Sequence, residues 1–358
     1  MKIAIDAGPL YGHRTGVGVA AAGMLDALAA RDDVELAPYL VSGRSTPEPG
    51  HRRLPVPGIV ASHLWSRLDR PRADRWIGPA QVVHGTNYVA PPTSMPTVVS
   101  VYDCWFLRHP ELAIPVVRRA GQTLRRAVAR GAWVHTTSDV TAGEVSELLG
   151  IDRVATVFLG APPTPQRVDE TPAALIDLTG RRFIVAIGTE ERRKGLGVLV
   201  KAFDQLAGDH EEIHLVLAGA PGDDSEAVIS RIDAATHSSR IRRLGPIDET
   251  TKAWLLHHAA ALAYPSLDEG FGFPILEAQL AGTPVVATAV GSIPEVAGDA
   301  ARLVSDRDPA TFAAALEEVL AGAGRLGLIE AGLRNAARFT WDTTADGLVG
   351  LYERVVAG

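Results

Sequence analysis

Two glutamates stand eight positions apart around a glycine-rich segment, Glu269 and Glu277 in YPSLDEGFGFPILEAQLA (264–281). The apolar run 261–264 predicts a buried strand, and Pro274 with the helix formers behind it predicts a helix that begins near Pro274. Glu277 is then expected in the first helical turn. A helix that starts where a parallel strand ends favours phosphate groups at its N-terminus, and carboxylates accept hydrogen bonds from hydroxyl groups. The segment therefore predicts a site for a nucleotide sugar.

The full string around these glutamates resembles the retaining glycosyltransferases of family four, which have the two-domain GT-B fold. The match is P-S-x-x-E-G-F-G-x-P-x-L-E-A, which begins here at Pro265. The resemblance implies that Glu269 binds the transferred sugar ring and that Glu277 binds the ribose of the nucleotide. The alternative is an ordinary strand, turn and helix with exposed glutamates. The backbone amides implied to meet the donor sugar and its phosphates are those of Gly270, Phe271 and Gly272.

A second charged segment follows a predicted buried strand in RFIVAIGTEERRKGLGVLVKAFDQL (182–206). Arg193 and Lys194 stand at the turn before a predicted helix, where two cations suit a diphosphate. The family places an Arg/Lys pair there, and its mannosyltransferase-like branch often has G-T-x-E-x-R-K, which this chain matches from Gly188 to Lys194. The resemblance thus assigns Gly188, Arg193 and Lys194 to the donor site. Taken alone, such charge at a helix start is more typical of solvated surface, and Arg192 is an extra cation of that kind.

The N-terminal segment predicts a first strand at 2–7, a loop at 8–18 and an alanine-rich helix from about Val19. Gly16 and Gly18 open that helix and fit the start of a dinucleotide-binding pattern. They stand about ten residues after the strand instead of directly behind it, which argues against that class. In the resembled family a glycine-rich loop here faces the donor phosphates. The resemblance therefore assigns Gly16 and Gly18 to donor binding.

Polar loops are expected after two further buried strands, in 81–92 and 96–112, and they should line a cleft. The resembled family often has His-Asp where this chain has Tyr102-Asp103, and that histidine commonly touches the donor sugar. A phenol is larger and neutral but still forms hydrogen bonds. Either Tyr102 contacts the donor differently, or another residue takes over, and for each histidine a structural role is an equal alternative. The candidates for that second possibility are Asp103, His84 and His109.

Transfer to an acceptor hydroxyl requires a stabilised leaving group and a site that excludes water. Arg193, Lys194 and the helix start near Pro274 are expected to stabilise the leaving diphosphate. The resemblance implies retention of the anomeric configuration, with the departing phosphate accepting the acceptor's proton. The predicted catalytic residues are Glu269, Asp103, Arg193 and Lys194, with Glu269 as a sugar-binding group more than a covalent nucleophile.

The chain has 358 residues, which exceeds the size at which one core usually keeps growing, so two domains are expected. Strand and helix patterns alternate in both halves, which predicts an α/β protein with parallel sheets. The resembled GT-B fold implies two Rossmann-like domains that face each other across a cleft. The best linker is 154–172. The predicted units are an acceptor domain at 1–165, a nucleotide-sugar donor domain at 173–340, and a terminal helix at 341–358 that crosses back to the first domain.

Charge is distributed unevenly along the chain. Residues 1–170 carry 18 Lys and Arg against 16 Asp and Glu, and residues 171–358 carry 17 against 26. Six arginines gather in 51–76 among leucines and tryptophans, which predicts contact with an anionic membrane or an anionic acceptor. The alternative is a solvated helix face. Nucleic acid is excluded as a partner because the chain is acidic and has no recognition motif.

Other function classes are disfavoured by what the sequence lacks. No apolar run reaches about 18 residues, and the N-terminus passes directly into a strand, so we expect a cytoplasmic protein, in peripheral contact with the inner face of the membrane if 51–76 binds lipid. The single cysteine, Cys104, excludes an internal disulfide and is not expected to be a nucleophile. No Cys/His cluster has zinc spacing, and no Asp-x-Asp motif of the metal-dependent type is recognised, so we expect no metal and no other cofactor.

The donor and acceptor are less defined than the reaction. The G-T-x-E-x-R-K variant favours GDP-mannose, and UDP-sugars stay open. A glycan, a lipid-linked saccharide or a small metabolite are all open as acceptors. Two other functions also remain: a sugar-nucleotide epimerase of similar fold, and a sugar-nucleotide binding protein without catalysis.

Overall fold

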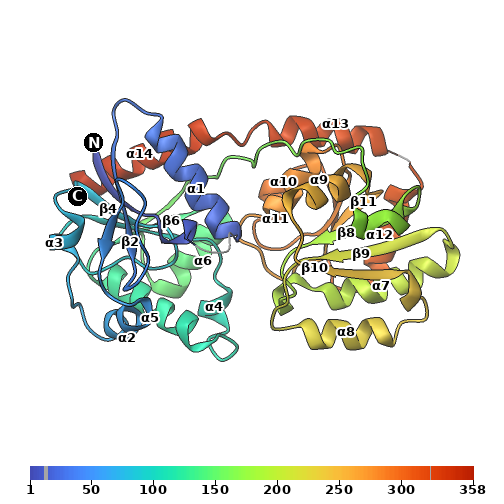
Figure 1. Cartoon of the computed structure of the whole chain (residues 1–358), viewed down its shortest axis with the longest axis horizontal. Coiled ribbons are helices and arrows are strands. Elements are labelled where there is room, and N and C mark those ends of the chain that lie inside the picture. The colour runs from blue at the N-terminus through green and yellow to red at the C-terminus, as the bar shows by residue number, and fades with distance from the viewer. Residues whose placement is uncertain (12–14, 323) are drawn as a thin grey trace. The chain divides into compact units, whose positions relative to one another are not determined.

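The structure is a computed structural model that describes residues 1–11, 15–322 and 324–358. The chain divides into two compact units. Unit 1 comprises Met1–Gly160 and Phe339–Gly358, and unit 2 comprises Ala161–Arg338. Figure 1 shows this division, with the red C-terminal helix α14 beside the blue helix α1 of unit 1.

Unit 1 is built on a seven-stranded sheet in which all neighbouring strands are parallel. The strand order is β3-β2-β1-β4-β5-β6-β7. The central strands are apolar on both faces, as expected for a parallel sheet covered by helices. The strands are β1 (Lys2–Asp6), β2 (Glu35–Val41), β3 (Arg52–Leu54), β4 (Val82–Gly85), β5 (Thr97–Val101), β6 (Trp133–Thr136) and β7 (Val154–Thr156).

The helices of unit 1 connect these strands and cover the sheet. Ser138 caps α6 by accepting a hydrogen bond from the backbone N–H of Thr141, which is the structural role expected of a serine before a helix. The helices are η1 (Gly8–Leu10), α1 (Gly16–Ala29), α2 (Gly58–Trp65), α3 (Asp74–Ile77), α4 (Trp105–Arg108), α5 (Pro115–Ala129), α6 (Asp139–Leu149) and α14 (Trp341–Ala357).

The first α-helix starts earlier than the sequence predicted. It begins at Gly16 and not at about Val19, so both Gly16 and Gly18 lie inside α1 and not in a loop before it. The alanine-rich sequence that follows the two glycines lets the helix extend back through them despite their low helix propensity. Residues 12–14 of the predicted loop lie outside the described residues.

The C-terminal helix α14 completes unit 1. It packs on α1, β4 and β5. Trp341 at its start lies so close to two glycines that side chains there would overlap its ring: a Cβ atom on Gly23 would lie 2.2 Å from the ring, and one on Gly160 would lie 2.5 Å from it. Thr344 also donates a hydrogen bond to the carbonyl oxygen of Phe158 at 2.8 Å. The last helix therefore fits a seat made by residues more than a hundred positions earlier.

Unit 2 is built on a six-stranded sheet of the same kind. The strand order is β10-β9-β8-β11-β12-β13, again with parallel neighbours. The strands are β8 (Arg182–Ile187), β9 (Ile213–Ala218), β10 (Ile241–Gly245), β11 (Ala261–Tyr264), β12 (Val285–Thr288) and β13 (Arg302–Val304). The helices are η2 (Ala173–Leu178), η3 (Arg192–Lys194), α7 (Leu196–Asp209), α8 (Ser225–Asp233), η4 (Ser238–Arg240), α9 (Glu249–His258), α10 (Phe273–Leu280), α11 (Ile293–Ala297), α12 (Pro309–Leu320) and α13 (Arg325–Ala336).

Helices cover both faces of the unit 2 sheet. One apolar cluster joins the strands to α7 and α12, and Phe203 and Phe312 are fully buried in it. The other cluster joins the opposite face to α9, α10 and α11 around Phe183 and Trp254, whose rings stack at 5.8 Å. These two layers are the doubly wound arrangement that alternating strand and helix patterns indicate. The prediction of an α/β protein with two parallel-sheet, Rossmann-like domains is confirmed.

Candidate active site

The two charged motifs follow the two strands at which the unit 2 sheet changes direction. From β8 the chain adds β9 and then β10 on one side, whereas β11, β12 and β13 extend the other side. The neighbours β8 and β11 therefore form the switch point, where ligands bind in open α/β sheets. The segment 188–195 leaves the carboxyl end of β8, and the segment 265–272 leaves the carboxyl end of β11.

A lysine, a tyrosine and a glutamate meet at this point. The Nζ atom of Lys194 lies 2.5 Å from Oε2 of Glu269. The hydroxyl group of Tyr264 donates to the same oxygen at 2.6 Å and accepts from Lys194 at 3.1 Å. The side chains of Lys194 and Glu269 are only 13% and 11% exposed. Tyr264 was not predicted as a site residue, because its only sequence feature is its place at the end of an apolar strand.

Arg193 adds a second cation to this cluster. Its Nη1 atom lies 3.4 Å from Oε2 of Glu269, and its Nε atom lies 2.7 Å from Oε2 of Glu191. Glu191 is the acidic residue of the G-T-x-E-x-R-K string, so the string supplies an ion partner for its own arginine. Arg193, Lys194 and Glu269, predicted from separate motifs, are thus brought together.

The cluster fixes the protonation state of its carboxylate. Burial alone would raise the pKa of Glu269, but the charges of Lys194 and Arg193 outweigh burial and lower the pKa to about 2. Burial also raises the pKa of Tyr264 well above its ordinary value, so its hydroxyl stays protonated and donates. A carboxylate with so low a pKa is a weak proton acceptor near neutral pH. The arrangement suits binding and electrostatic stabilisation.

The two motifs are also joined by contacts of their backbones. The N–H of Leu267 donates to the carbonyl oxygen of Arg193 at 2.6 Å. Gly195 has a φ of +63°, and a Cβ atom there would lie 2.2 Å from the carbonyl oxygen of Pro265. Only glycine adopts this conformation at such a close approach without strain. Ser292 holds the other side of the turn by donating from both N–H and Oγ to the carbonyl oxygen of Glu269, each at 2.9 Å.

The helix α10 places Glu277 differently from the prediction. The helix begins at Phe273 after Gly272, whose φ of +100° suits a glycine before the helix. Pro274 is therefore its second residue, and Glu277 is its fifth, so the prediction that Glu277 lies in the first turn was wrong. Both predicted residues Gly270 and Phe271 lie in the turn before this helix start, and Phe271 is buried.

Glu277 does not join the cluster around Glu269 but has a cation of its own. Its Oε1 atom accepts from Nζ of Lys252 on α9 at 2.8 Å, and Lys252 also pairs with Glu249. Burial alone would lower the pKa of Lys252, but the charges of Glu277 and Glu249 outweigh it and raise the pKa. Lys252 was missed from the sequence because it stands on an ordinary helix 25 positions away.

A second missed pair holds the turn that carries Arg193 and Lys194. Glu190 is 2% exposed, and its Oε2 atom accepts from Nη2 of Arg243 on β10 at 2.8 Å. The carbonyl oxygen of Glu190 accepts from the N–H of Asp224 at 2.9 Å, and its own N–H donates to the carbonyl oxygen of Ala220 at 3.0 Å. These contacts fasten 188–195 to the loop after β9. We call Glu190 and Arg243 the turn clamp.

Tyr102 and Asp103 lie in unit 1, at the carboxyl end of β5. Tyr102 is 8% exposed, and its hydroxyl donates to the carbonyl oxygen of Thr86 at 2.7 Å. Asp103 accepts from the hydroxyl of Tyr88 and from the N–H of Trp105, both at 3.1 Å. Tyr88 has a φ of +59°, which is unusual for a residue other than glycine. The predicted residues Gly16 and Gly18 belong to the same unit, so the predicted site residues are divided between units 1 and 2.

The histidines considered as substitutes for the family's histidine have structural contacts. His84 is fully buried, with Nδ1 bonded to the hydroxyl of Tyr352 at 2.7 Å and Nε2 to Oγ of Ser100 at 2.8 Å. Ser100 continues this chain to Nδ1 of His135 at 2.8 Å. His109 lies against Trp105, with ring centroids 4.3 Å apart. His84 thus belongs to a hydrogen-bonded core, which is the structural alternative considered for it.

Known proteins identify the class of the molecule. Residues 181–322, which contain both charged motifs and the turn clamp, match the family described as Glycosyl transferases group 1. This part of the chain is a group 1 glycosyl transferase domain. The protein is therefore an enzyme, a glycosyltransferase, and the matched residues lie within unit 2 and include its switch point.

Two curated relatives of the glycosyltransferase cover most of its length. It is 28% identical over 301 residues to the O-antigen chain mannosyltransferase B of Escherichia coli, with 80% of this chain and 78% of that protein covered. It is also 28% identical over 314 residues to the D-inositol 3-phosphate glycosyltransferase of Mycobacterium bovis, with 83% of this chain covered. The chain spans only 62% of that second relative's length.

The solved structures establish the fold. The glycosyltransferase matches sucrose-phosphate synthase from Thermosynechococcus elongatus with a TM-score of 0.76 at 18% identity, over 100% of this chain and 99% of that one. The GT-B fold class predicted from the sequence is thereby confirmed.

The glycosyltransferase contains one Asp-x-Asp string. It is Asp306-Arg307-Asp308. Asp308 caps α12 by accepting from the N–H of Ala310, and Asp306 accepts from Thr311 and from the N–H of Asp308, so both carboxylates shape a helix start. Among the described residues, no group of three or more His, Cys, Asp or Glu side chains is placed to hold a metal ion.

Proposed function

We propose that the protein is a retaining glycosyltransferase of family four that moves a hexose, with mannose favoured, from a nucleoside diphosphate sugar to an acceptor hydroxyl. The acceptor is a glycan, a glycolipid or a small metabolite. The observation that carries the proposal is the meeting of Arg193, Lys194 and Glu269 at the switch point of unit 2. The mannosyltransferase among the relatives and the G-T-x-E-x-R-K string support mannose, with GDP-mannose as donor and a UDP-sugar as the alternative.

Each part of the donor has a candidate partner in unit 2. Arg193 and Lys194 receive the diphosphate, because guanidinium and ammonium groups form charge-assisted hydrogen bonds with phosphate oxygens. Glu269 accepts hydrogen bonds from the sugar hydroxyls. Glu277, oriented by Lys252, accepts from the ribose hydroxyls. The backbone positions proposed to meet the sugar and phosphates are Gly188, Gly270, Phe271 and Gly272.

The chemistry follows from the charges. Bond cleavage leaves negative charge on the diphosphate, and the two cations with the N-terminus of α10 stabilise that charge. Glu269 is held ionised by the same cations, so it keeps them in place before the donor arrives. With a pKa of about 2, Glu269 does not serve as the base for the acceptor hydroxyl. The departing phosphate accepts that proton.

Four residues of unit 1 complete the proposal. Gly16, Gly18 and Tyr102 contribute to donor binding, and Asp103 contributes to catalysis. We infer that the reaction proceeds without a metal or cofactor and takes place in the cytoplasm. None of the described helices is both long and apolar enough to cross a membrane.

The test is thermal stabilisation of the purified chain by UDP-, GDP-, ADP- and dTDP-sugars in the presence of a chelator. A bound donor stabilises the fold by mass action, by about 2.7 kcal/mol at one hundred times Kd. We expect one nucleotide to stand out, and Glu277→Ala and Lys194→Ala to lose its effect. Lys201→Ala, an exposed lysine on α7, is the matched control and keeps the shift. No shift with any sugar nucleotide would contradict the proposal.

Product analysis separates transfer from the two alternative functions. A transferase slowly releases free sugar from its bound donor when no acceptor is present. An epimerase releases the nucleotide with an altered or unsaturated sugar, and a binding protein turns nothing over. Release of an altered sugar would replace the proposed function with epimerisation.

A further inference from the structure

Unit 1 carries a surface on which arginines and exposed aliphatic side chains are concentrated. The segments 51–76 and 108–130 contain 12 arginines and three acidic residues, a net charge of +9 in a chain whose net charge is −7. The rest of the chain therefore carries −16. The same segments hold six of the twelve large hydrophobic side chains found exposed among the described residues: Ile59, Val60, Leu68, Leu112, Ile114 and Val116.

The two segments form one surface because α2 packs against α5, as Figure 1 shows. Nε of Arg119 on α5 donates to Oγ of Ser62 on α2 at 2.9 Å. Ile59 and Val116 each stand about one helical turn before this contact, and their side chains are 66% and 49% exposed. Aliphatic side chains and the arginines of α5 thus lie side by side. We call 51–76 and 108–130 the arginine surface.

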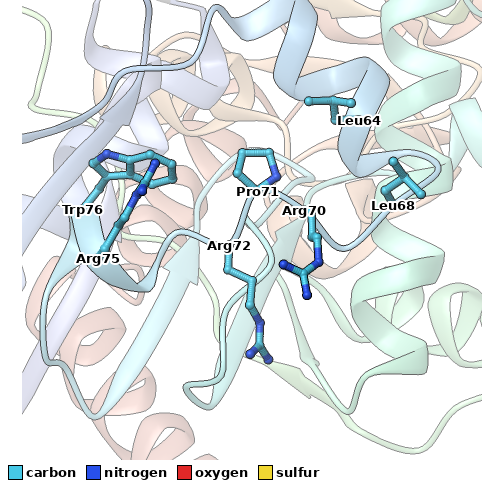
Figure 2. A pocket seen from close by; sticks show the side chains of 7 residues that line it. All are labelled: Leu64, Leu68, Arg70, Pro71, Arg72, Arg75 and Trp76. Carbon is cyan, nitrogen blue, oxygen red and sulfur yellow. The ribbon is translucent and has the colours of Figure 1, made fainter.

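The turn between α2 and α3 presents its arginines from a fixed backbone. Nε1 of Trp65 donates to the carbonyl oxygen of Pro71 at 3.2 Å, and the N–H of Ala73 donates to the carbonyl oxygen of Pro92 at 2.8 Å. Figure 2 shows Arg70 and Arg72 extending from this turn in the same direction. The hollow that they line with Arg75 and Trp76 is closed on its other side by Leu64 and Leu68.

The charges of this turn are not neutralised by the protein. Asp69 pairs with Arg126 at 3.0 Å and with Arg130, both on or next to α5. Arg75 lies over the ring of Trp76 at 4.0 Å. Four exposed arginines form no ion pair within the part of the chain that the structure describes: Arg67, Arg70, Arg72 and Arg75.

We propose that the arginine surface docks unit 1 on an anionic lipid bilayer. Arginine binds phosphodiester oxygens through its paired N–H groups, and each basic residue near an anionic bilayer strengthens attachment. Exposed aliphatic side chains enter the boundary between headgroups and acyl chains, and a tryptophan suits the same depth. A small soluble anion would need few arginines converging on one point. This surface spreads them over two segments among exposed aliphatic side chains, which fits a planar partner.

The inference rests on unit 1 alone and holds whatever sugar nucleotide unit 2 binds. The test is cosedimentation of the full chain with vesicles of phosphatidylcholine alone, or with about one third phosphatidylglycerol. We expect binding to the anionic vesicles at about 0.05 M salt, loss of binding at about 0.5 M salt, and little binding to the neutral vesicles. Arg70→Glu/Arg72→Glu/Arg75→Glu should weaken binding at least about tenfold.

A matched control distinguishes binding through the arginine surface from attraction by the overall charge of the chain. Arg167→Glu/Lys201→Glu/Arg334→Glu makes the same charge change at exposed positions of unit 2 and should bind as the natural chain does. Ile59→Ser/Leu68→Ser leaves the charge unchanged and should weaken binding several-fold through lost apolar contact. All these side chains are exposed, so melting temperatures and the sugar-nucleotide shift should stay unchanged.

Three results would overturn the inference. The first is equal loss of binding in the unit 2 control, which would make the attraction a matter of overall charge. The second is equal binding to neutral and anionic vesicles. The third is absence of vesicle binding at low salt while inorganic phosphate stabilises the chain and the triple arginine variant abolishes that effect, which would make the hollow a site for a soluble anion.

Discussion

Tyr264 connects the carboxylate and the ammonium of the candidate donor site. Its hydroxyl donates to Glu269 at 2.6 Å and accepts from Lys194 at 3.1 Å. The tyrosine therefore sets the distance between the sugar-binding group and the cation proposed for the diphosphate. Its importance did not follow from residue type, because a tyrosine at the end of an apolar strand is also typical of a core.

We predict that Tyr264→Phe weakens donor binding by about five- to tenfold. The change removes the buried hydroxyl that holds Lys194 and Glu269, and a loss of about 1–1.4 kcal/mol in their positioning corresponds to this factor. Equilibrium titration with the stabilising sugar nucleotide measures the effect. Tyr352→Phe removes a buried hydroxyl from unit 1 and should leave the affinity unchanged. An unchanged affinity in Tyr264→Phe would show that the cluster holds its geometry without this residue.

The residues with charge-bearing motifs were predictable, and their partners were not. Arg193, Lys194 and Glu269 stand directly after apolar strands, and the carboxyl ends of parallel strands meet at one edge of a sheet. Lys252 and Arg243 stand on an unremarkable helix and an edge strand, 25 and 53 positions from their partners. Such pairs depend on tertiary packing, which periodicity does not encode.

At the scale of elements, the site depends on how the turn after β8 is held. Glu190 and Arg243 fasten this turn to the strand two places away in the sheet. The Glu190 side chain is 3% exposed and that of Arg243 is 29% exposed, so the pair is largely shielded from water. Loss of one partner leaves the other charge buried and unpaired.

We predict that Glu190→Gln and Arg243→Met each lower the free energy of unfolding of unit 2 by about 1–3 kcal/mol. The combined variant Glu190→Gln/Arg243→Met should lose less than the sum, because it leaves no charge unpaired. Chemical denaturation measures stability, and donor titration should show weaker binding in both single variants. Additive losses, with donor affinity unchanged, would mean that the pair does not position the turn.

The boundaries of elements were predicted less well than their existence. The apolar runs at 182–187 and 261–264 are strands, as predicted. The helices α1 and α10 begin at Gly16 and Phe273, because neighbouring residues and a left-handed glycine decide where a helix starts. Because the helix starts one residue before Pro274, Glu277 is its fifth residue, and it pairs with Lys252 on α9.

At the scale of the molecule, unit 1 contains titrating groups that oppose one another. Burial lowers the pKa of His135 to about 4 and that of His84 well below its ordinary value. In the unfolded chain both histidines become protonated near pH 6.5, whereas in the folded chain they stay neutral there. Both histidines therefore make unit 1 less stable as pH falls below about 6.5. Burial raises the pKa of Asp6 to about 7, despite a hydrogen bond from Gly8. As pH falls, Asp6 becomes protonated at a higher pH in the folded state than in the unfolded state. Its protonation therefore stabilises unit 1 as pH falls below about 7.

We predict that His135→Gln reduces the acid sensitivity of stability by up to about 1.4 kcal/mol per pH unit between pH 6.5 and pH 4, because one depressed histidine is removed. Asp6→Asn should increase the sensitivity, because the opposing proton uptake disappears. Denaturant titrations at pH 7 and pH 5 measure both slopes. Tyr352→Phe is the control. It removes the hydrogen bond between Tyr352 and His84 and should lower the free energy of unfolding by the same amount at both pH values. Identical slopes in all variants would rule out these groups as the source.

The order of the strands and the return of the last helix lie beyond what composition and periodicity encode. Alternating patterns predicted two parallel sheets, and 358 residues predicted two units. Which strand lies beside which is decided by the packing of helices on the sheets, and only a resemblance to a known fold suggested where the terminal helix goes. The contact of Trp341 with Gly23 and Gly160 could not be predicted from the sequence around either glycine, because nothing there distinguishes it from other small residues.

That seat has a consequence for a chain still being synthesised. The ribosome releases Gly23 early, but the tryptophan that occupies its surface emerges only after all of unit 2 has been translated. Unit 2 can therefore complete its core before unit 1 does, although residues 1–160 of unit 1 are translated earlier. Until residues 339–358 have been translated, the surface of α1 on which α14 packs stays uncovered.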